Sequence, residues 1–393
     1  MSRKLFYLFS ILIAISFLAV ACGAKPTATT APASGEVAAP VIETVEVIKT
    51  VIVTQEVTVQ GTPLPPEVLK PKGYGETLAA VQANGKVVCG VHTSLLGFGY
   101  LDENGRNIGF DIDFCRAVAA AVLGDPDAIE AVPITAADRG PVLQTGEVNM
   151  VTRNMTWTSK RDAEWGNFTW ITFYDGQGFL VRKDSGIATL QDMDGATVCV
   201  TTGTTTEKNL ATSFADAGLT YEAVTFEDTP SVYSAYVEGR CDVATSDKSQ
   251  LAAARAGFAT PEDHIILPIT ISKEPLTPAV PTGDDQWFDI VKTVIWGLVN
   301  AEEYGITSAN VEEMKSNENS DIRAMLGVEG EADWGYTALG LSPDSLAKAI
   351  SAVGNYGEIY DRYFGANGIA FQLDRGLNNL WTNGGLMYAP PIK

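Results

Sequence analysis

The segment from Val151 to Asp162 concentrates side chains that could bind a small anion. It starts at the end of a run typical of a β-strand, residues 147–152, and contains two arginines, four hydroxyls, an amide and a tryptophan. Arg161 could hold a carboxylate through two parallel N–H bonds, and Asn154 and Thr156 could orient it. Considered alone, a segment of this kind is more often a solvated surface loop with an isolated salt bridge.

A second possible anion site is the run Thr201-Thr-Gly-Thr-Thr-Thr-Glu207, which also follows a predicted strand. Thr204 and Glu207 have the spacing of a capping box, so a helix should begin there. Backbone N–H groups at a helix start bind anions, and Gly203 and Thr205 lie in this stretch. An ordinary capped helix would also explain Thr204, and the Gly-Lys-Ser/Thr ending of a phosphate loop is absent from the run.

Asp247 provides the opposite charge at the end of another predicted strand. An aspartate in this position either caps the following helix or accepts hydrogen bonds from a ligand ammonium group. Capping is sufficient to explain the residue by itself.

The elements that must position these residues alternate between strand and helix from residue 85 onward. This alternation predicts an α/β fold with largely parallel sheets, whose ligand-binding loops follow the carboxyl ends of the strands. The hydrophobic periodicity and the glycine stops predict strands at 86–91, 129–134, 148–152, 197–200, 223–226, 242–245 and 264–269, and helices at 111–123, 136–145, 231–239, 287–304 and 343–364, with Asp111 as the cap of the first helix.

Composition indicates an acidic globular protein with room for two or more domain cores in 393 residues. The formal net charge is −21, and it becomes −23 without residues 1–21, which hold two basic and no acidic residues. Such a surface repels nucleic acid and anionic membranes, so we expect no nucleic-acid partner.

The amino end has the layout of a bacterial export signal, with Arg3 and Lys4 before an apolar run. Cys22 follows small residues and resembles the lipidated cysteine of a lipoprotein, so we expect a signal peptide at 1–21 and a membrane anchor through an N-terminal lipid. A soluble secreted protein and a retained anchor are the alternatives. Residues 22–75 include stretches rich in Ala, Thr and Pro and are interpreted as a flexible stalk.

Four cysteines remain beyond Cys22, and an exported protein with an even number favours disulfides over thiols. Three connectivities are possible. Pairing within each half of the α/β region, Cys89 with Cys115 and Cys199 with Cys241, would leave the halves able to move. A zinc site is not expected, because the sequence has no Cys-x-x-Cys and only two histidines.

From about residue 85 to the end, the sequence resembles the general L-amino-acid-binding proteins of bacterial ABC transporters, among the family 3 extracellular solute-binding proteins. The resemblance rests on Gly109-Phe-Asp-Ile-Asp-Phe-Cys-Arg116, Arg153-Asn-Met-Thr-Trp-Thr158, Tyr174-Asp-Gly-Gln-Gly-Phe179, Asp194-Gly-Ala-Thr-Val-Cys199, Thr202-Gly-Thr-Thr-Thr-Glu207, Gly239-Arg-Cys-Asp242, Ser272-Lys-Glu-Pro-Leu276, Gly283-Asp-Asp-Gln-Trp-Phe-Asp289 and Asn383-Gly-Gly-Leu-Met-Tyr-Ala-Pro-Pro391. It implies a two-lobed periplasmic-binding-protein-like type II fold, with two mainly parallel sheets flanked by helices and a two-strand hinge.

The family pattern implies a role for each of five residues at the ligand. Arg161 corresponds to the arginine that binds the α-carboxylate, and Asn154 and Thr156 to contacts from the same lobe. Thr205 corresponds to the second-lobe group on that carboxylate, and Asp247 to the aspartate that binds the α-ammonium.

The residue that often stacks an aromatic ring on the ligand side chain is Leu95 here, so the resemblance does not determine side-chain specificity. His92 could reach the side-chain pocket, although a histidine after a strand is more often a hydrogen-bonded structural residue. Lobe one is expected at 76–178, lobe two at 179–275, and the return to lobe one with a helical C-terminal extension at 276–393. The chain should pass between lobes near 177–181 and 271–277.

The resemblance implies a non-enzymatic, extracytoplasmic protein without cofactor that captures a free L-amino acid and delivers it to the permease subunits of an ABC transporter. The alternative on the same fold is a cyclohexadienyl or arogenate dehydratase, which would need a general acid above the leaving hydroxyl. Asp247 is the only acid that the sequence places in the cleft, and a carboxylate paired with an ammonium donates protons poorly.

Overall fold

The computed structural model describes residues 73–393. The predicted signal peptide, the predicted lipidation site Cys22 and the predicted stalk up to residue 72 lie outside the described residues. Within the described range, no helix combines the length and the apolar character needed to cross a bilayer.

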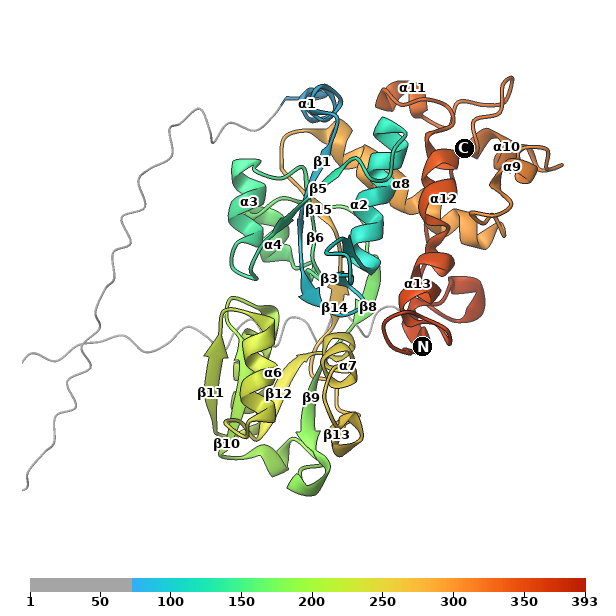
Figure 1. The fold of residues 1–393 in the computed structure, drawn as a ribbon. Helices are drawn as coiled ribbons and strands as arrows, with labels where there is room; N and C mark the ends of the chain where they lie inside the picture. The colour runs from blue at the N-terminus through green and yellow to red at the C-terminus, as the bar shows by residue number, and fades with distance from the viewer. Residues whose placement is uncertain (1–72) are drawn as a thin grey trace, which may run out of the picture. The chain divides into compact units, whose positions relative to one another are not determined.

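Two five-stranded sheets form the framework, and Figure 1 shows one above the other. The first sheet has the order β5-β1-β6-β15-β7, and the second β11-β10-β12-β9-β13. In each sheet one strand runs antiparallel to both of its neighbours, β15 in the first sheet and β9 in the second. The other four strands of each sheet share one direction. The prediction of two mainly parallel sheets is therefore confirmed. We call the part built on the first sheet lobe one and the part built on the second sheet lobe two.

The strands of lobe one are β1 (Val87–Val91), β5 (Ile129–Pro133), β6 (Met150–Thr152), β7 (Asn167–Phe168) and β15 (Ala279–Val280), with a small three-stranded sheet of β2 (Ser94–Leu95), β3 (Gly99–Leu101) and β4 (Asn107–Ile108). The strands of lobe two are β9 (Gln177–Arg182), β10 (Ala196–Thr201), β11 (Tyr221–Phe226), β12 (Val243–Asp247) and β13 (His264–Ile266).

The chain passes between the lobes through two paired strands, β8 (Phe173–Asp175) and β14 (Glu274–Leu276). The second passage lies within the predicted 271–277. The first passage precedes the predicted 177–181, because that apolar run forms β9 inside the lobe-two sheet instead.

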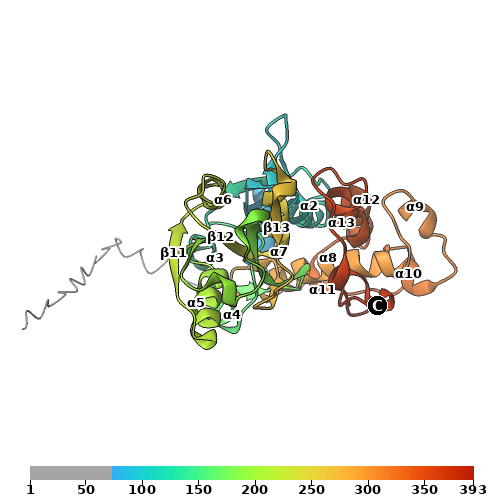
Figure 2. The ribbon, with the colours of Figure 1, turned by 90° about the horizontal axis from the view of Figure 1, so that it is seen from below.

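The helices are α1 (Glu76–Asn84), α2 (Phe110–Leu123), α3 (Arg139–Thr145), α4 (Ser159–Glu164), α5 (Thr205–Ala217), α6 (Thr229–Val237), α7 (Lys248–Ala256), α8 (Asp285–Glu303), α9 (Val311–Met314), α10 (Ser320–Met325), α11 (Tyr336–Leu339), α12 (Ser345–Val353) and α13 (Tyr356–Phe364). In lobe two, α5 packs on one face of the sheet and α6 and α7 on the other, which Figure 2 shows from below. In lobe one, α8, α12 and α13 pack around α2 (Figure 1).

Two helix predictions were wrong in detail. Asp111 does not cap α2, because the helix begins immediately after Gly109. Gly109 has a φ of 139°, a value that glycine adopts readily and other residues rarely do. The Asp111 carboxylate instead accepts a hydrogen bond from the Asn154 N–H. The run 343–364 forms two helices, because Gly354 adopts a φ of 85° and Asn355 with Glu358 makes a capping box that starts α13.

Both expected disulfides are present. Cys89 of β1 is bonded to Cys115 of α2, and Cys199 of β10 is bonded to Cys241 just before β12. Each bond lies within one lobe. The first joins cysteines that are 26 residues apart in the sequence, and the second joins cysteines that are 42 residues apart. The two cross-links therefore brace each lobe without tying one lobe to the other.

Candidate functional site

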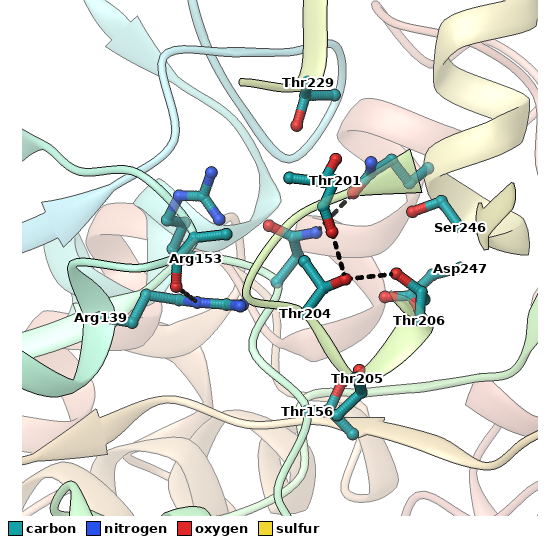
Figure 3. A pocket seen from close by; sticks show the side chains of 13 residues that line it. Arg139, Arg153, Thr156, Thr201, Thr204, Thr205, Thr206, Thr229, Ser246 and Asp247 are labelled. Atoms are coloured by element: carbon teal, nitrogen blue, oxygen red, sulfur yellow. Dashed lines mark hydrogen bonds between the residues drawn. The ribbon is translucent and has the colours of Figure 1, made fainter. Parts of the chain in front are cut away.

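A small cavity of about 30 Å³ lies between the two lobes. Figure 3 shows Arg139 and Arg153 on one side of it and Asp247 on the other. Thirteen residues line the cavity: Ala136, Arg139, Arg153, Asn154, Thr156, Thr201, Thr204, Thr205, Thr206, Thr229, Ser246, Asp247 and Gln250. Four predicted ligand-binding residues, Asn154, Thr156, Thr205 and Asp247, are among them.

The loop after β6 brings Asn154 and Thr156 to the cavity through a strained turn. Asn154 has a φ of 30°, the only positive value among the described residues other than glycine. Its N–H donates to the buried Asp111 carboxylate at 2.7 Å, and its Nδ2 donates across the cavity to Gln250 Oε1 at 2.9 Å. Burial raises the pKa of Asp111 to about 7, although the Asn154 N–H and the Arg153 charge act in the opposite direction.

The start of α5 forms the lobe-two side of the cavity. Thr204 caps the helix by accepting the Glu207 N–H at 3.1 Å, as its spacing predicted. Glu207 returns to the Gly203 N–H rather than to the Thr204 N–H, which shifts the capping box by one residue. The cap thereby presents Thr205 and Thr206 to the cavity.

Asp247 lies at the end of β12 before α7, yet its side chain forms no capping hydrogen bond. Its Oδ1 is buried and has no hydrogen-bond partner in the described part of the chain. Burial, together with the charges of Asp175 and Glu274, raises the pKa of Asp247 well above its ordinary value, against the effect of Arg139 and Arg161. An unpaired buried carboxylate oxygen is costly, so this position favours a ligand cation over a structural cap.

Arg139 is a site residue that the sequence reasoning missed, because it was assigned to the body of a predicted helix. The structure places it at the first position of α3, where its Nε donates to the Ala136 carbonyl at 2.9 Å. Its Nη2 is buried without a hydrogen-bond partner among the described residues. Burial, then the charges of Arg161 and Arg153, holds the pKa of Arg139 well below its ordinary value. Its place after the end of β5 was the signal that could have identified it.

Arg161 is buried beside the cavity and is not among the residues that line it. Its Nη1 donates to the Thr156 carbonyl at 3.0 Å, and its guanidinium lies 4.7 Å from the centre of the Trp165 ring. Burial lowers the pKa of Arg161 to about 10, while the charges of Glu274 and Asp247 oppose that shift. Arg161 therefore adds positive charge behind Thr156.

The remaining predicted residues lie near the cavity but outside its lining. The His92 Nε2 lies 3.3 Å from the Thr229 hydroxyl of the other lobe, so His92 supports a lining residue. Leu95 is 2% exposed and belongs to the lobe-one core. A side chain at Gly203 would lie 3.7 Å from Ala137 across the two lobes.

Glu274 of β14 is a second buried residue that the sequence reasoning missed. It is 1% exposed and accepts hydrogen bonds from Thr156 and Thr205, one residue from each lobe. An acid in a crossover strand was the available signal, but its neighbours depend on the tertiary structure.

The similarities to known proteins agree with this architecture. The chain is 51% identical to the general L-amino acid-binding periplasmic protein AapJ of Rhizobium johnstonii and 48% identical to the glutamate/glutamine/aspartate/asparagine-binding protein BztA of Rhodobacter capsulatus, in each case over 81% of this chain and 93% of the relative. A solved periplasmic binding protein of an ABC transporter from Brucella ovis, with glutathione bound, has a TM-score of 0.78 and 46% identity over 81% of this chain and 99% of that one.

The named relatives are binding proteins, so the comparisons give the dehydratase alternative no support. Residues 87–366 match the bacterial extracellular solute-binding proteins, family 3, and the chain belongs to that family.

Proposed function

We propose that this protein captures a free L-amino acid in the cavity between its lobes and delivers it to the permease of an ABC transporter outside the cytoplasm. The observation that supports this most directly is the pair of unpartnered buried atoms, Asp247 Oδ1 and Arg139 Nη2, in one cavity of the described structure. An amino acid with an acidic side chain supplies the missing partner for each, its ammonium for the Asp247 carboxylate and one of its two carboxylates for the Arg139 guanidinium.

The surplus of arginine favours an amino acid with an acidic side chain. Arg139 and Arg153 line the cavity and Arg161 lies behind it, whereas Asp247 is the only acid in the lining among residues 73–393. One arginine suffices for the α-carboxylate, a role for which the sequence pattern favours Arg161. Arg139 is then available for a second carboxylate, and the name of one relative, BztA, includes glutamate and aspartate beside their amides.

The proposal includes attachment of the mature protein to the membrane through a lipid on Cys22. The lipid would keep the protein close to the permease, and residues 22–75 would give it reach. A shift in mass and in detergent partitioning after Cys22→Ser would test the anchor separately from ligand binding.

The test of the function is calorimetric titration of the purified protein against the twenty amino acids, with product analysis of each mixture. We expect saturable binding that is tightest for L-glutamate or L-aspartate, without turnover. Arg161→Ala and Asp247→Ala should each weaken binding at least tenfold, since each removes a charge-assisted contact. Absence of binding for every amino acid, or a new product, would overturn the proposal. Unchanged affinity in both variants would show that the ligand binds elsewhere.

A further inference from the structure

Glu274 lies where both lobes meet the second crossover strand, and its carboxylate is surrounded by donors. Its Oε2 accepts from the hydroxyls of Thr156 and Thr205, at 2.5 and 2.9 Å. Its Oε1 accepts from the Asn209 amide and the Ser272 hydroxyl, at 2.7 and 2.5 Å. Lobe one, lobe two and the crossover segment each contribute at least one of these donors. Four donors on two oxygens is the pattern of an ionised carboxylate, which can only accept.

This arrangement determines how two hydroxyls of the cavity can act. A threonine hydroxyl has one hydrogen and two lone pairs. The hydrogens of Thr156 and Thr205 are both directed to Glu274, so none is left for the 3.3 Å contact between the two hydroxyl oxygens. Both residues line the cavity, and their hydroxyls therefore present only lone pairs to a ligand.

Two further oxygen atoms of cavity-lining residues can also only accept hydrogen bonds from a ligand. Asn154 Oδ1 and Asp247 Oδ1 are buried and lack hydrogen-bond partners among residues 73–393. Lone pairs repel the oxygens of a carboxylate and accept from an ammonium, which has three hydrogens to donate. The hydroxyls of Thr156 and Thr205 thus favour the ammonium of a ligand rather than its carboxylate.

We propose that Glu274 is a positioning residue that fixes the hydroxyls of Thr156 and Thr205 as acceptors and so makes the cavity select an α-ammonium group. This inference rests on the proposed function and changes one part of it. The family pattern assigned Thr205 to the α-carboxylate, whereas here its hydroxyl is an acceptor, so only its backbone N–H at the start of α5 could donate to that group.

The test compares L-glutamate with L-2-hydroxyglutarate, in which a hydroxyl replaces the ammonium, in wild type and Glu274→Met. Methionine cannot accept the hydroxyl hydrogens, so both threonines become able to donate into the cavity. We expect the Kd for L-glutamate to rise about tenfold, the effect of one charge-assisted hydrogen bond, and the Kd for L-2-hydroxyglutarate to change less than about threefold. Weak binding is measured by competition.

A double variant, Glu274→Gln with Asn209→Asp, keeps one negative charge within this pair of residues. It therefore distinguishes the effect of the direction of the threonine hydroxyl hydrogens on affinity from the effect of losing a buried negative charge. The carboxylate introduced at position 209 accepts from the amide nitrogen introduced at position 274, which turns the amide oxygen toward both threonines. We expect this variant to recover most of the preference for L-glutamate over L-2-hydroxyglutarate. Melting temperatures of all variants show whether each one is folded.

A purely structural role for Glu274 would weaken both ligands by the same factor and would leave their affinity ratio unchanged, which would overturn the inference. An unaltered affinity for L-glutamate in Glu274→Met would overturn it as well. These results differ from failure of the proposed function, in which the wild-type protein itself binds no amino acid.

Discussion

The two sides of the cavity differ in charge and in the way they are built. Lobe one contributes three buried arginines, Arg139, Arg153 and Arg161, whereas lobe two contributes the carboxylate of Asp247 and a helix start rich in hydroxyls. Each side buries polar atoms that are unpaired within the described chain, and each such atom costs about 1–3 kcal/mol. A site with this arrangement is favourable only when a ligand with both charges completes it, which is what a capture protein requires.

Removal of the lobe-two charge should have the largest effect. Asp247→Asn should weaken L-glutamate binding about 100-fold or more, because the ammonium loses its ionic partner. The unliganded protein should melt at a higher temperature, because burial and the charges of Asp175 and Glu274 disfavour the ionised Asp247. Calorimetry and thermal melts measure the two effects.

The matched control is Glu222→Gln, which neutralises an exposed acid on β11 of the same lobe. It should change neither the affinity nor the melting temperature. A similar loss of affinity in both variants would mean that the net charge of lobe two, rather than one contact, attracts the ligand.

Removal of one lobe-one charge should have a smaller and more selective effect. Arg139→Met should weaken L-glutamate about 10–100-fold and L-glutamine less, because only L-glutamate has a second carboxylate. Titration of both ligands measures the difference, with Arg106→Gln on the exposed hairpin as control. Equal losses for the two ligands would instead assign Arg139 to the α-carboxylate.

Asp111 is a buried acid in lobe one, the lobe that contributes the three arginines. Its titration should make the unfolding free energy depend on pH. Its pKa of about 7 lies above that of an unfolded aspartate, so the folded state binds a proton more tightly. Its contribution to stability is therefore present below about pH 4 and is lost as the pH rises through about 7. Unfolding free energies of the unliganded wild type, relative to Asp111→Asn, should fall by about 1 kcal/mol per pH unit in this window. A flat or rising difference would contradict the assignment.

The hydrogen bond between His92 of lobe one and Thr229 of lobe two should have the smallest effect on ligand affinity. Burial and the charges of Arg153 and Arg139 hold the pKa of His92 well below its ordinary value, so it meets Thr229 as a neutral ring. Thr229→Val removes one neutral hydrogen bond and should reduce affinity at most about threefold. A loss above tenfold in calorimetry would place Thr229 in direct contact with the ligand.

Much of the fold could be predicted from local patterns in the sequence. Strand and helix alternation, glycine stops and the Thr204 cap depend on residues close in the chain, and the disulfides followed from which cysteines share one half. The errors arose where distant residues intervene. Asp111 was predicted as a cap, but its partner is Asn154, which is far away in the sequence and near in the fold.

The sequence by itself determined which charges exist and that they follow strand ends, because strand ends are set by local hydrophobic pattern and turns. Only the tertiary structure decided that Arg139 rather than Arg161 lines the cavity, and that Glu274 receives the hydrogens of Thr156 and Thr205. The physical reason is that the direction of a buried polar side chain depends on partners from both lobes and the crossover strand, which the chain brings together only by folding.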